Sequence, residues 1–186
     1  MRKLASCSVL VLTTCLMMAQ PLEGQKRGPG GIIDWIHRLS GPSMLALGGS
    51  YSWEIEEGGT RVRVGAVLGF PVARKDRIGD DQKLNMFSLQ PSAEFPIFNS
   101  PVEVKTGLNI HRFGGTGHDP VWHLSVPLYL QLRLAVDSDQ NLFLRIAPGF
   151  QYFPAFGYFD FDREIEVNRD GGEWTFAIQA GLDFMK

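Results

Sequence analysis

The sequence predicts an all-β fold: an up-and-down antiparallel β-barrel of eight strands, preceded by a short N-terminal helix. The first observation is a strict alternation of apolar and polar residues over residues 121–136. Its even positions are all apolar: Trp122, Leu124, Val126, Leu128, Leu130, Leu132 and Leu134. Successive side chains of a strand point to opposite faces, whereas a helix would mix the two sets at every turn. This segment is therefore predicted to be one strand with an apolar and a polar face.

Two further observations support a barrel. The same alternation recurs along residues 43–186, and the 21 glycines and 11 prolines of the chain are typical of many strands and turns. Residues 121–136 are long for an ordinary strand. They suit a strand that crosses a bilayer obliquely, which needs roughly 9–11 residues in the hydrocarbon. We therefore expect residues 43–186 to form a transmembrane β-barrel domain.

The first 24 residues have the pattern of a signal peptide. Arg2 and Lys3 supply the positive charge, an apolar run follows them, and cleavage is expected after Ala19 or Gly24. After Ala19, no apolar run approaches the ~18 residues that a transmembrane helix needs. The sequence thus predicts an exported chain that could cross a membrane only with strands.

Charge and cysteine content exclude other classes. The formal charge of −2 and the lack of a basic run argue against a nucleic-acid partner. Both cysteines, Cys7 and Cys15, fall within the signal segment, so the mature chain is expected to have no disulfide. Lipid attachment at one of them is an alternative: residues 4–7 have the letters of a lipoprotein cleavage box but no apolar stretch before them, and residues 12–15 are better placed but match it less well.

Residues 25–42 are expected to form a linker and a short amphipathic helix. Residues 32–39 would place Ile32, Ile36 and Leu39 on one helical face, and Ser40, Gly41 and Pro42 would end the helix. A helix this short is not stable alone. We expect it to cap one end of the barrel; an interfacial membrane helix is the alternative.

Seven segments of the barrel domain alternate strongly: residues 45–55, 62–70, 87–97, 102–110, 121–136, 142–152 and 174–184. A bacterial barrel with both ends on the periplasmic side needs an even number of strands. Residues 158–167 are the best candidate for the eighth, followed by a hairpin signal at residues 168–172, although they could belong to a long surface loop. With this choice, long loops fall on the side where short turns are expected.

The apolar faces are expected to contact lipid. The polar faces combine glycine, alanine and serine with charges of both signs, which suits a narrow closed interior better than a solvent-exposed surface. Aromatic residues lie at strand ends, as an interfacial girdle requires: Trp53, Phe70, Trp122, Tyr152, Trp174 and Phe184. The residues chosen as lipid-facing are Leu124, Leu128, Leu132, Leu144, Phe176 and Leu182. A soluble lipocalin-like, lipid-binding periplasmic barrel, with the apolar faces inward, is the alternative.

The polar faces predict a network of interior charges. Its expected members are Glu54, Arg61, Arg63, Glu94, Glu103, Lys105, Arg133, Arg145 and Asp183. Buried charges must pair, and an eight-stranded barrel is only wide enough for side chains, so we expect a filled lumen without an open pore. A polar path for a small solute is the alternative.

Residues 44–186 resemble the small outer-membrane β-barrels of Gram-negative bacteria, through the alternating strands and the terminal Ala180-Gly181-Leu182-Asp183-Phe184. The resemblance implies a location in the outer membrane, with its lipid and the barrel-insertion machinery as partners. It also implies a structural, adhesive or envelope-maintenance role carried by the loops, whose partner the sequence does not identify. The family usually ends on the aromatic residue that this machinery reads, whereas here Met185 and Lys186 follow Phe184.

One motif raises the question of catalysis. His123 and Ser125 lie on one strand face and Asp137 follows, and His-x-Ser resembles the motif of outer-membrane lipid A deacylases. In that family the catalytic groups face lipid, whereas these two share the inward face. We therefore expect two hydrogen-bonded interior residues and no enzyme, with a lipid A-modifying esterase as the alternative. No metal-ligand spacing, phosphate loop or dinucleotide motif is present, and no cofactor is expected.

Overall fold

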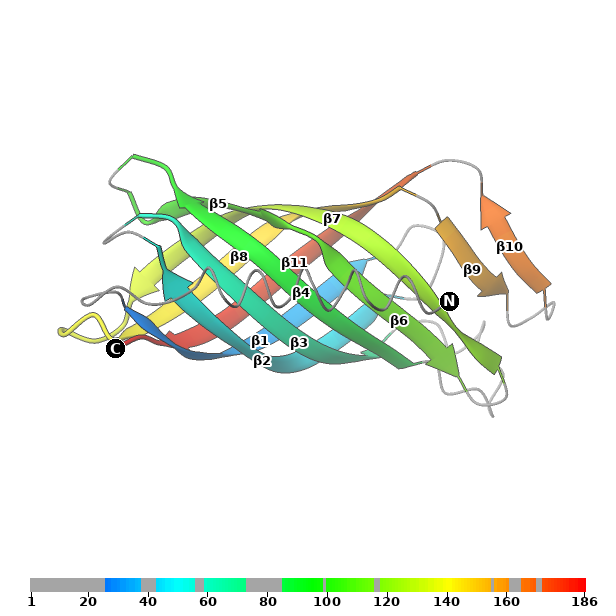
Figure 1. The fold of residues 1–186 in the computed structure, drawn as a ribbon, viewed down its shortest axis with the longest axis horizontal. Helices are drawn as coiled ribbons and strands as arrows, with labels where there is room; N and C mark the ends of the chain where they lie inside the picture. The colour runs from blue at the N-terminus through cyan, green and yellow to red at the C-terminus, as the bar shows by residue number, and fades with distance from the viewer. Residues whose placement is uncertain are drawn as a thin grey trace.

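The computed structural model shows a closed antiparallel β-barrel (Figure 1). It describes residues 26–37, 43–55, 59–72, 85–98, 100–115, 118–154, 156–160, 165–169 and 172–186. These residues contain no helix that could span a bilayer.

Eight strands close the barrel, which confirms the predicted fold class. They are β1 (Arg27–His37), β2 (Met44–Glu54), β3 (Arg61–Pro71), β4 (Asn85–Pro96), β5 (Val102–Gly107) with β6 (Asn109–Gly115), β7 (His118–Ala135), β8 (Leu142–Phe153) and β11 (Glu173–Phe184). β5 and β6 both pair with β4 and β7 and are separated only at Leu108, so together they form one barrel strand. Every neighbouring pair is antiparallel, and β11 pairs with β1 to close the sheet.

The predicted N-terminal helix is wrong, because residues 27–37 form the first barrel strand. β1 pairs with β2 on one side and with β11 on the other. Ile32 and Ile36 are four residues apart, a spacing that places them on one face of a helix and also on one face of a strand. Both point into the barrel and are buried. The barrel therefore begins at Arg27, within the segment for which the sequence predicts a linker and a helix.

The predicted eighth strand, residues 158–167, is also corrected. β9 (Phe156–Asp160) and β10 (Ile165–Arg169) pair only with each other, in a separate two-stranded sheet. Figure 1 shows this hairpin beyond the barrel, at the end opposite the C-terminus. With β1 as the missing strand, the short connections at residues 55–60, 97–101 and 136–141 lie at the end where β1 starts and β11 finishes. The conflict in loop lengths disappears, since the long connections all lie at the other end.

Apolar side chains point outward and polar ones inward, as predicted. On β7, Leu128 is 52% exposed, whereas Gln131 is fully buried. All six residues chosen as lipid-facing lie on the outer face. A soluble barrel that binds lipid inside would need the reverse arrangement, so the described residues exclude the lipocalin-like alternative.

Aromatic side chains lie on the outer face near both ends of the barrel. Trp53 is near the end where the chain termini of the barrel lie, 6.3 Å from Tyr51 between ring centroids. Tyr152 and Trp174 lie toward the opposite end, with ring centroids 5.0 Å apart. Phe70 and Trp122 are exposed at that same end, and Phe184 is exposed at the terminal end. Two aromatic belts therefore bracket the exposed aliphatic band, as in transmembrane barrels.

The interior differs between its two halves. The half nearest the termini holds the charged side chains described below. The half nearest the β9–β10 hairpin mixes two kinds of buried side chain. Apolar ones fill the space between strands, namely Ile36, Met44, Met86, Phe113 and Phe153, and polar ones lie beside them, namely Ser88, His111, His123, Ser125, Gln151 and Thr175. The inward faces are thus less polar than the sequence pattern indicates, because apolar side chains also suit a closed interior that has no contact with solvent.

Candidate functional site: the charged interior of the barrel

Arg63 is the centre of the interior charge network. It is on the inward face of β3, and its side chain contacts the neighbouring strands β2 and β4 and reaches across the lumen to β11. The Nε and Nη2 atoms donate to Glu94 at 2.6 and 3.2 Å, and Nη1 and Nη2 donate to the two oxygens of Asp183, both at 2.7 Å. Nη1 also donates to the hydroxyl of Ser50 at 3.1 Å. One guanidinium therefore connects β3 to three other strands, β2, β4 and β11, with five hydrogen bonds.

Arg145 is a second cation at the same carboxylate. Its Nε lies 2.7 Å from Oδ2 of Asp183, and its Nη2 donates to the backbone carbonyl of Gly31 at 3.3 Å. Glycine makes room for this group at the seam between β1 and β11. A Cβ at Gly181 would lie 2.5 Å from Nη2 of Arg145, and one at Gly30 would overlap the Asp183 carboxylate. The two glycines of this seam therefore leave the space that the Arg145–Asp183 ion pair occupies.

Arg61 holds a group of three carboxylates nearer the terminal end. Its Nε lies 3.3 Å from Glu94 and its Nη1 lies 3.7 Å from Glu54, while its Nη2 donates to Glu103. Glu103 also accepts a hydrogen bond of 2.7 Å from Gln131. Because Glu94 contacts both Arg61 and Arg63, the two arginine centres form one continuous network.

Lys105 belongs to a third group, deeper in the barrel. Its ammonium donates to Gln179, and Gln179 donates to Gln90 at 3.0 Å. Gln90 in turn donates to Asp34 at 2.8 Å. Asp34 is fully buried on β1, and sequence reasoning missed it because that segment was assigned to a helix. A strand assignment would have placed it inward beside Ile32 and Ile36.

Arg133 stands apart from the other expected members of the network. Its guanidinium carbon lies 3.4 Å from the centre of the Phe143 ring. Its Nε and Nη2 atoms are shielded from solvent, yet they donate no hydrogen bond to any described residue. Of the nine charged residues chosen from the sequence, eight make an ion pair or a side-chain hydrogen bond in the interior; Arg133 does not.

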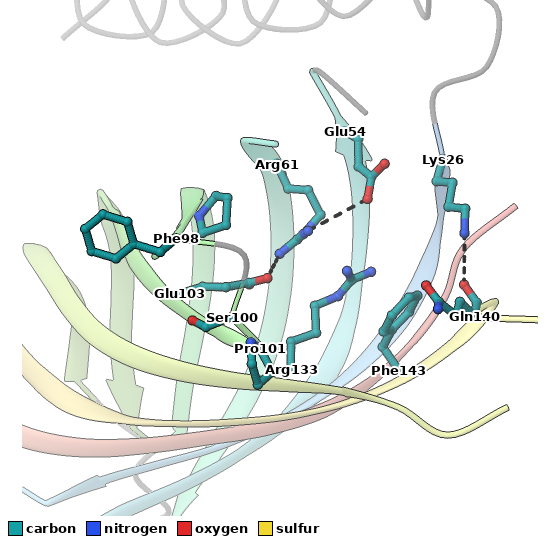
Figure 2. A pocket seen from close by; sticks show the side chains of 11 residues that line it. Lys26, Glu54, Arg61, Phe98, Ser100, Pro101, Glu103, Arg133, Gln140 and Phe143 are labelled. Carbon is teal, nitrogen blue, oxygen red and sulfur yellow. Dashed lines mark hydrogen bonds and ion pairs between the residues drawn. The ribbon is translucent and has the colours of Figure 1, made fainter. Parts of the chain in front are cut away.

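A pocket of about 530 Å³ opens at this end of the barrel. Figure 2 shows Arg133 between Arg61 and Phe143, with its guanidinium pointing into the pocket. Glu54 and Glu103 line the pocket with Arg61, to which both are bound. In the part of the chain that the structure describes, the charged interior meets the barrel opening at this pocket.

The catalytic candidates do not form a triad. Ser125 is fully buried; its hydroxyl lies 2.8 Å from Nε2 of His111 and donates to Gln151 at 3.0 Å. His123 packs edge-on against Phe113, with ring centroids 5.5 Å apart. Asp137 is in the β7–β8 turn, where its carboxylate accepts the backbone N–H of residues 141 and 142. The three residues thus occupy three different environments.

The described residues hold no group of three or more side chains suited to a metal ion. Their interior carries equal numbers of carboxylates and cations: Asp34, Glu54, Glu94, Glu103 and Asp183 against Arg61, Arg63, Lys105, Arg133 and Arg145. Such an arrangement can brace strands against one another, because buried ions are stable only when they are paired and hydrogen-bonded.

Comparison with known proteins identifies the fold. No protein-family model matches the chain, and no curated protein matches its sequence. The crystal structure of Neisserial surface protein A is similar with a TM-score of 0.58 and 13% identity, over 87% of this chain and 97% of that one. A major outer membrane protein from Thermus thermophilus gives a TM-score of 0.58 and 14% identity, over 88% of this chain and 100% of that one. The chain has the fold of the small eight-stranded outer-membrane barrels.

Proposed function

We propose that this protein is an integral outer-membrane barrel with a structural, envelope-maintenance role and a lumen closed by its own side chains. The observation that carries the proposal is the inverted arrangement of β7, with exposed leucines outside and buried polar residues inside. An aliphatic band of this kind would be unstable in water but matches the hydrocarbon of a bilayer. The two similar structures support the same placement, since one is a Neisserial surface protein and the other a major outer membrane protein.

The interior supports a closed lumen. Arg63 on β3 reaches across the lumen to Asp183 on β11, and the other half of the interior is filled with buried apolar and polar side chains. An eight-stranded barrel leaves only enough width for side chains. Purified protein in a planar bilayer should therefore show no steady conductance above that of the lipid. A reproducible step in current would contradict the closed lumen without affecting the membrane placement.

Fractionation tests the membrane placement directly. The full chain should remain in the membrane pellet after a carbonate or urea wash and enter solution only with detergent. On a gel, unboiled folded protein should migrate differently from boiled protein, as a closed barrel resists the detergent until it is heated. Release into the soluble fraction without detergent would refute the proposal.

The end of the chain is consistent with insertion by the outer-membrane machinery. Phe184 is an exposed aromatic at the end of β11, as the family pattern requires. The two residues after it extend the barrel wall: the N–H of Lys186 donates to the carbonyl of Arg27 at 2.9 Å, and Met185 is fully buried. We infer that Phe184 serves as the recognition residue. A Phe184→Ala variant should then accumulate outside the membrane, while Phe95→Ala, which removes an exposed aromatic from β4, should insert normally.

An adhesive role is the second candidate. The β9–β10 hairpin lies beyond the barrel at the end opposite the C-terminus, which would face outward in an outer membrane (Figure 1). Cells that express a chain without residues 156–169 should then bind a host surface less well than cells that express the full chain. Equal binding at equal surface expression would count against this role.

A further inference from the structure

The pocket at the terminal end has one cation that makes no ion pair or hydrogen bond with a described residue. Lys26 donates to the carbonyl of Gln140 at 3.2 Å, and Arg61 is held by three carboxylates. Among the charged residues that line the pocket, only Arg133 lacks an ion pair or a hydrogen bond from its side chain to a described residue. Figure 2 shows its guanidinium directed into the pocket and away from the barrel wall.

An arginine in this situation is unusual. Leaving a buried donor without an acceptor costs about 1–3 kcal/mol, and more when the group is charged. The Phe143 ring supports one face of the guanidinium, so its edge, which carries the N–H groups, stays directed at the pocket. That edge is a planar fork of donors, which fits the two oxygens of a carboxylate.

The charges around the pocket select for a single negative charge. Its lining contains three cations, Lys26, Arg61 and Arg133, and two carboxylates, Glu54 and Glu103. Three cations against two carboxylates leave the lining with one positive charge in excess. Both carboxylates are bound to Arg61, so neither neutralises Arg133. A ligand with two negative charges would be repelled by Glu54 and Glu103 once Arg133 is neutralised.

The remaining lining indicates an apolar body. Pro96, Phe98, Pro101 and Phe143 line the pocket, and the Phe98 side chain is 92% exposed. A volume of about 530 Å³ is in the usual range for small-molecule sites, about 300–1,000 Å³. The pocket therefore combines one carboxylate-binding group with a partly aromatic wall.

We propose that this pocket binds a small monocarboxylate with an apolar or aromatic body, and that Arg133 pairs with its carboxylate. In the proposed membrane orientation the pocket opens toward the periplasm. Binding itself does not depend on that orientation, so it can be tested on purified, folded protein in detergent.

The experiment compares phenylacetate with its neutral analogue phenylacetamide, titrated into the full chain in detergent micelles. Binding is followed by calorimetry and by the shift of the Arg133 Nε–H signal in NMR spectra. Phenylacetate should bind, and phenylacetamide should bind at least tenfold more weakly. An Arg133→Gln variant should lose at least tenfold in affinity for phenylacetate, whereas Arg112→Gln, a change on β6 well away from the pocket, should bind as the parent does.

Folding of each variant is checked by migration of unboiled samples on a gel. Arg133→Gln should fold, because the Arg133 side chain donates no hydrogen bond to a described residue. Equal binding of the acid and the amide, or equal binding by Arg133→Gln, would show partition into the micelle and overturn the proposal. Inorganic phosphate is titrated separately; if it binds as tightly as phenylacetate, the preference for a monocarboxylate is refuted.

Discussion

Removing Arg63 should strongly destabilise the barrel. The substitution Arg63→Met retains a long side chain but removes four charge-assisted hydrogen bonds, two to Glu94 and two to Asp183. Both carboxylates keep one cation: Glu94 stays 3.3 Å from Arg61, and Asp183 stays 2.7 Å from Arg145. One negative charge nevertheless remains in excess in the interior. Breaking one partner of a buried ion pair costs about 3–5 kcal/mol, and we expect a loss of this size in the free energy of unfolding.

Urea unfolding of the protein in lipid vesicles, followed by tryptophan fluorescence, measures the loss by linear extrapolation. Arg133→Met is the matched control, since it removes an arginine that makes no side-chain hydrogen bond to a described residue. It should cost no more than the cation–π contact with Phe143, about 0.5–2 kcal/mol. Adding Glu94→Gln to Arg63→Met should recover part of the stability, because the excess charge is removed while Arg61 keeps Glu103 and Arg145 keeps Asp183. Equal losses for the two arginine variants would refute the assignment of Arg63 as the centre of the network.

Three further predictions concern the barrel wall and interior. Leu128→Arg places a charge in the middle of the aliphatic band and should lower the free energy of unfolding by roughly 2–4 kcal/mol. Leu134→Arg, near the strand end, should lower it by about 0–1 kcal/mol. Equal costs would contradict the membrane placement. Gly149→Ala should destabilise the barrel, because its Cβ would overlap the Leu128 carbonyl, while Gly31→Ala, with no atom within 4 Å, should be neutral in the same unfolding assay. Ser125→Ala removes two buried hydrogen bonds and should lower the free energy of unfolding by about 1–3 kcal/mol. Mass spectra of lipid A from cells that express the parent or the variant should be the same. Altered lipid A with the parent alone would support the esterase alternative.

The alternation in the sequence was sufficient to predict seven strands and the direction of their side chains. Residues such as Leu128 and Gln131 differ sharply in polarity, and a one-residue shift of register would exchange their environments. β1 does not show this contrast. Ile32 and Ile36 point inward and Ile33 and Trp35 point outward, and all four are apolar. Polarity therefore does not distinguish the two faces of β1. The pairing of its backbone with β2 and β11, which no local pattern reveals, decides that it is a strand.

The interior charges were predicted by position but not by partner. Alternate residues along a barrel strand point inward, so Arg63 and Asp183 could be placed inside from the sequence. Which cation meets which carboxylate depends on the stagger of strands that are far apart in the chain. That stagger brings Asp183 between Arg63 and Arg145 and leaves Arg133 over Phe143 instead.

The pairing of β1 with β11 has a consequence for how the protein is made. The two strands lie at opposite ends of the barrel sequence, with Gly30 opposite Asp183, so the sheet cannot be completed until the final residues have been synthesised. A chain that stopped short of β11 would present two open edges, at β1 and β8. Each unpaired amide or carbonyl in hydrocarbon costs several kcal/mol. A product that lacks β11 is therefore expected to insert poorly, since the unpaired edges of β1 and β8 would both face hydrocarbon.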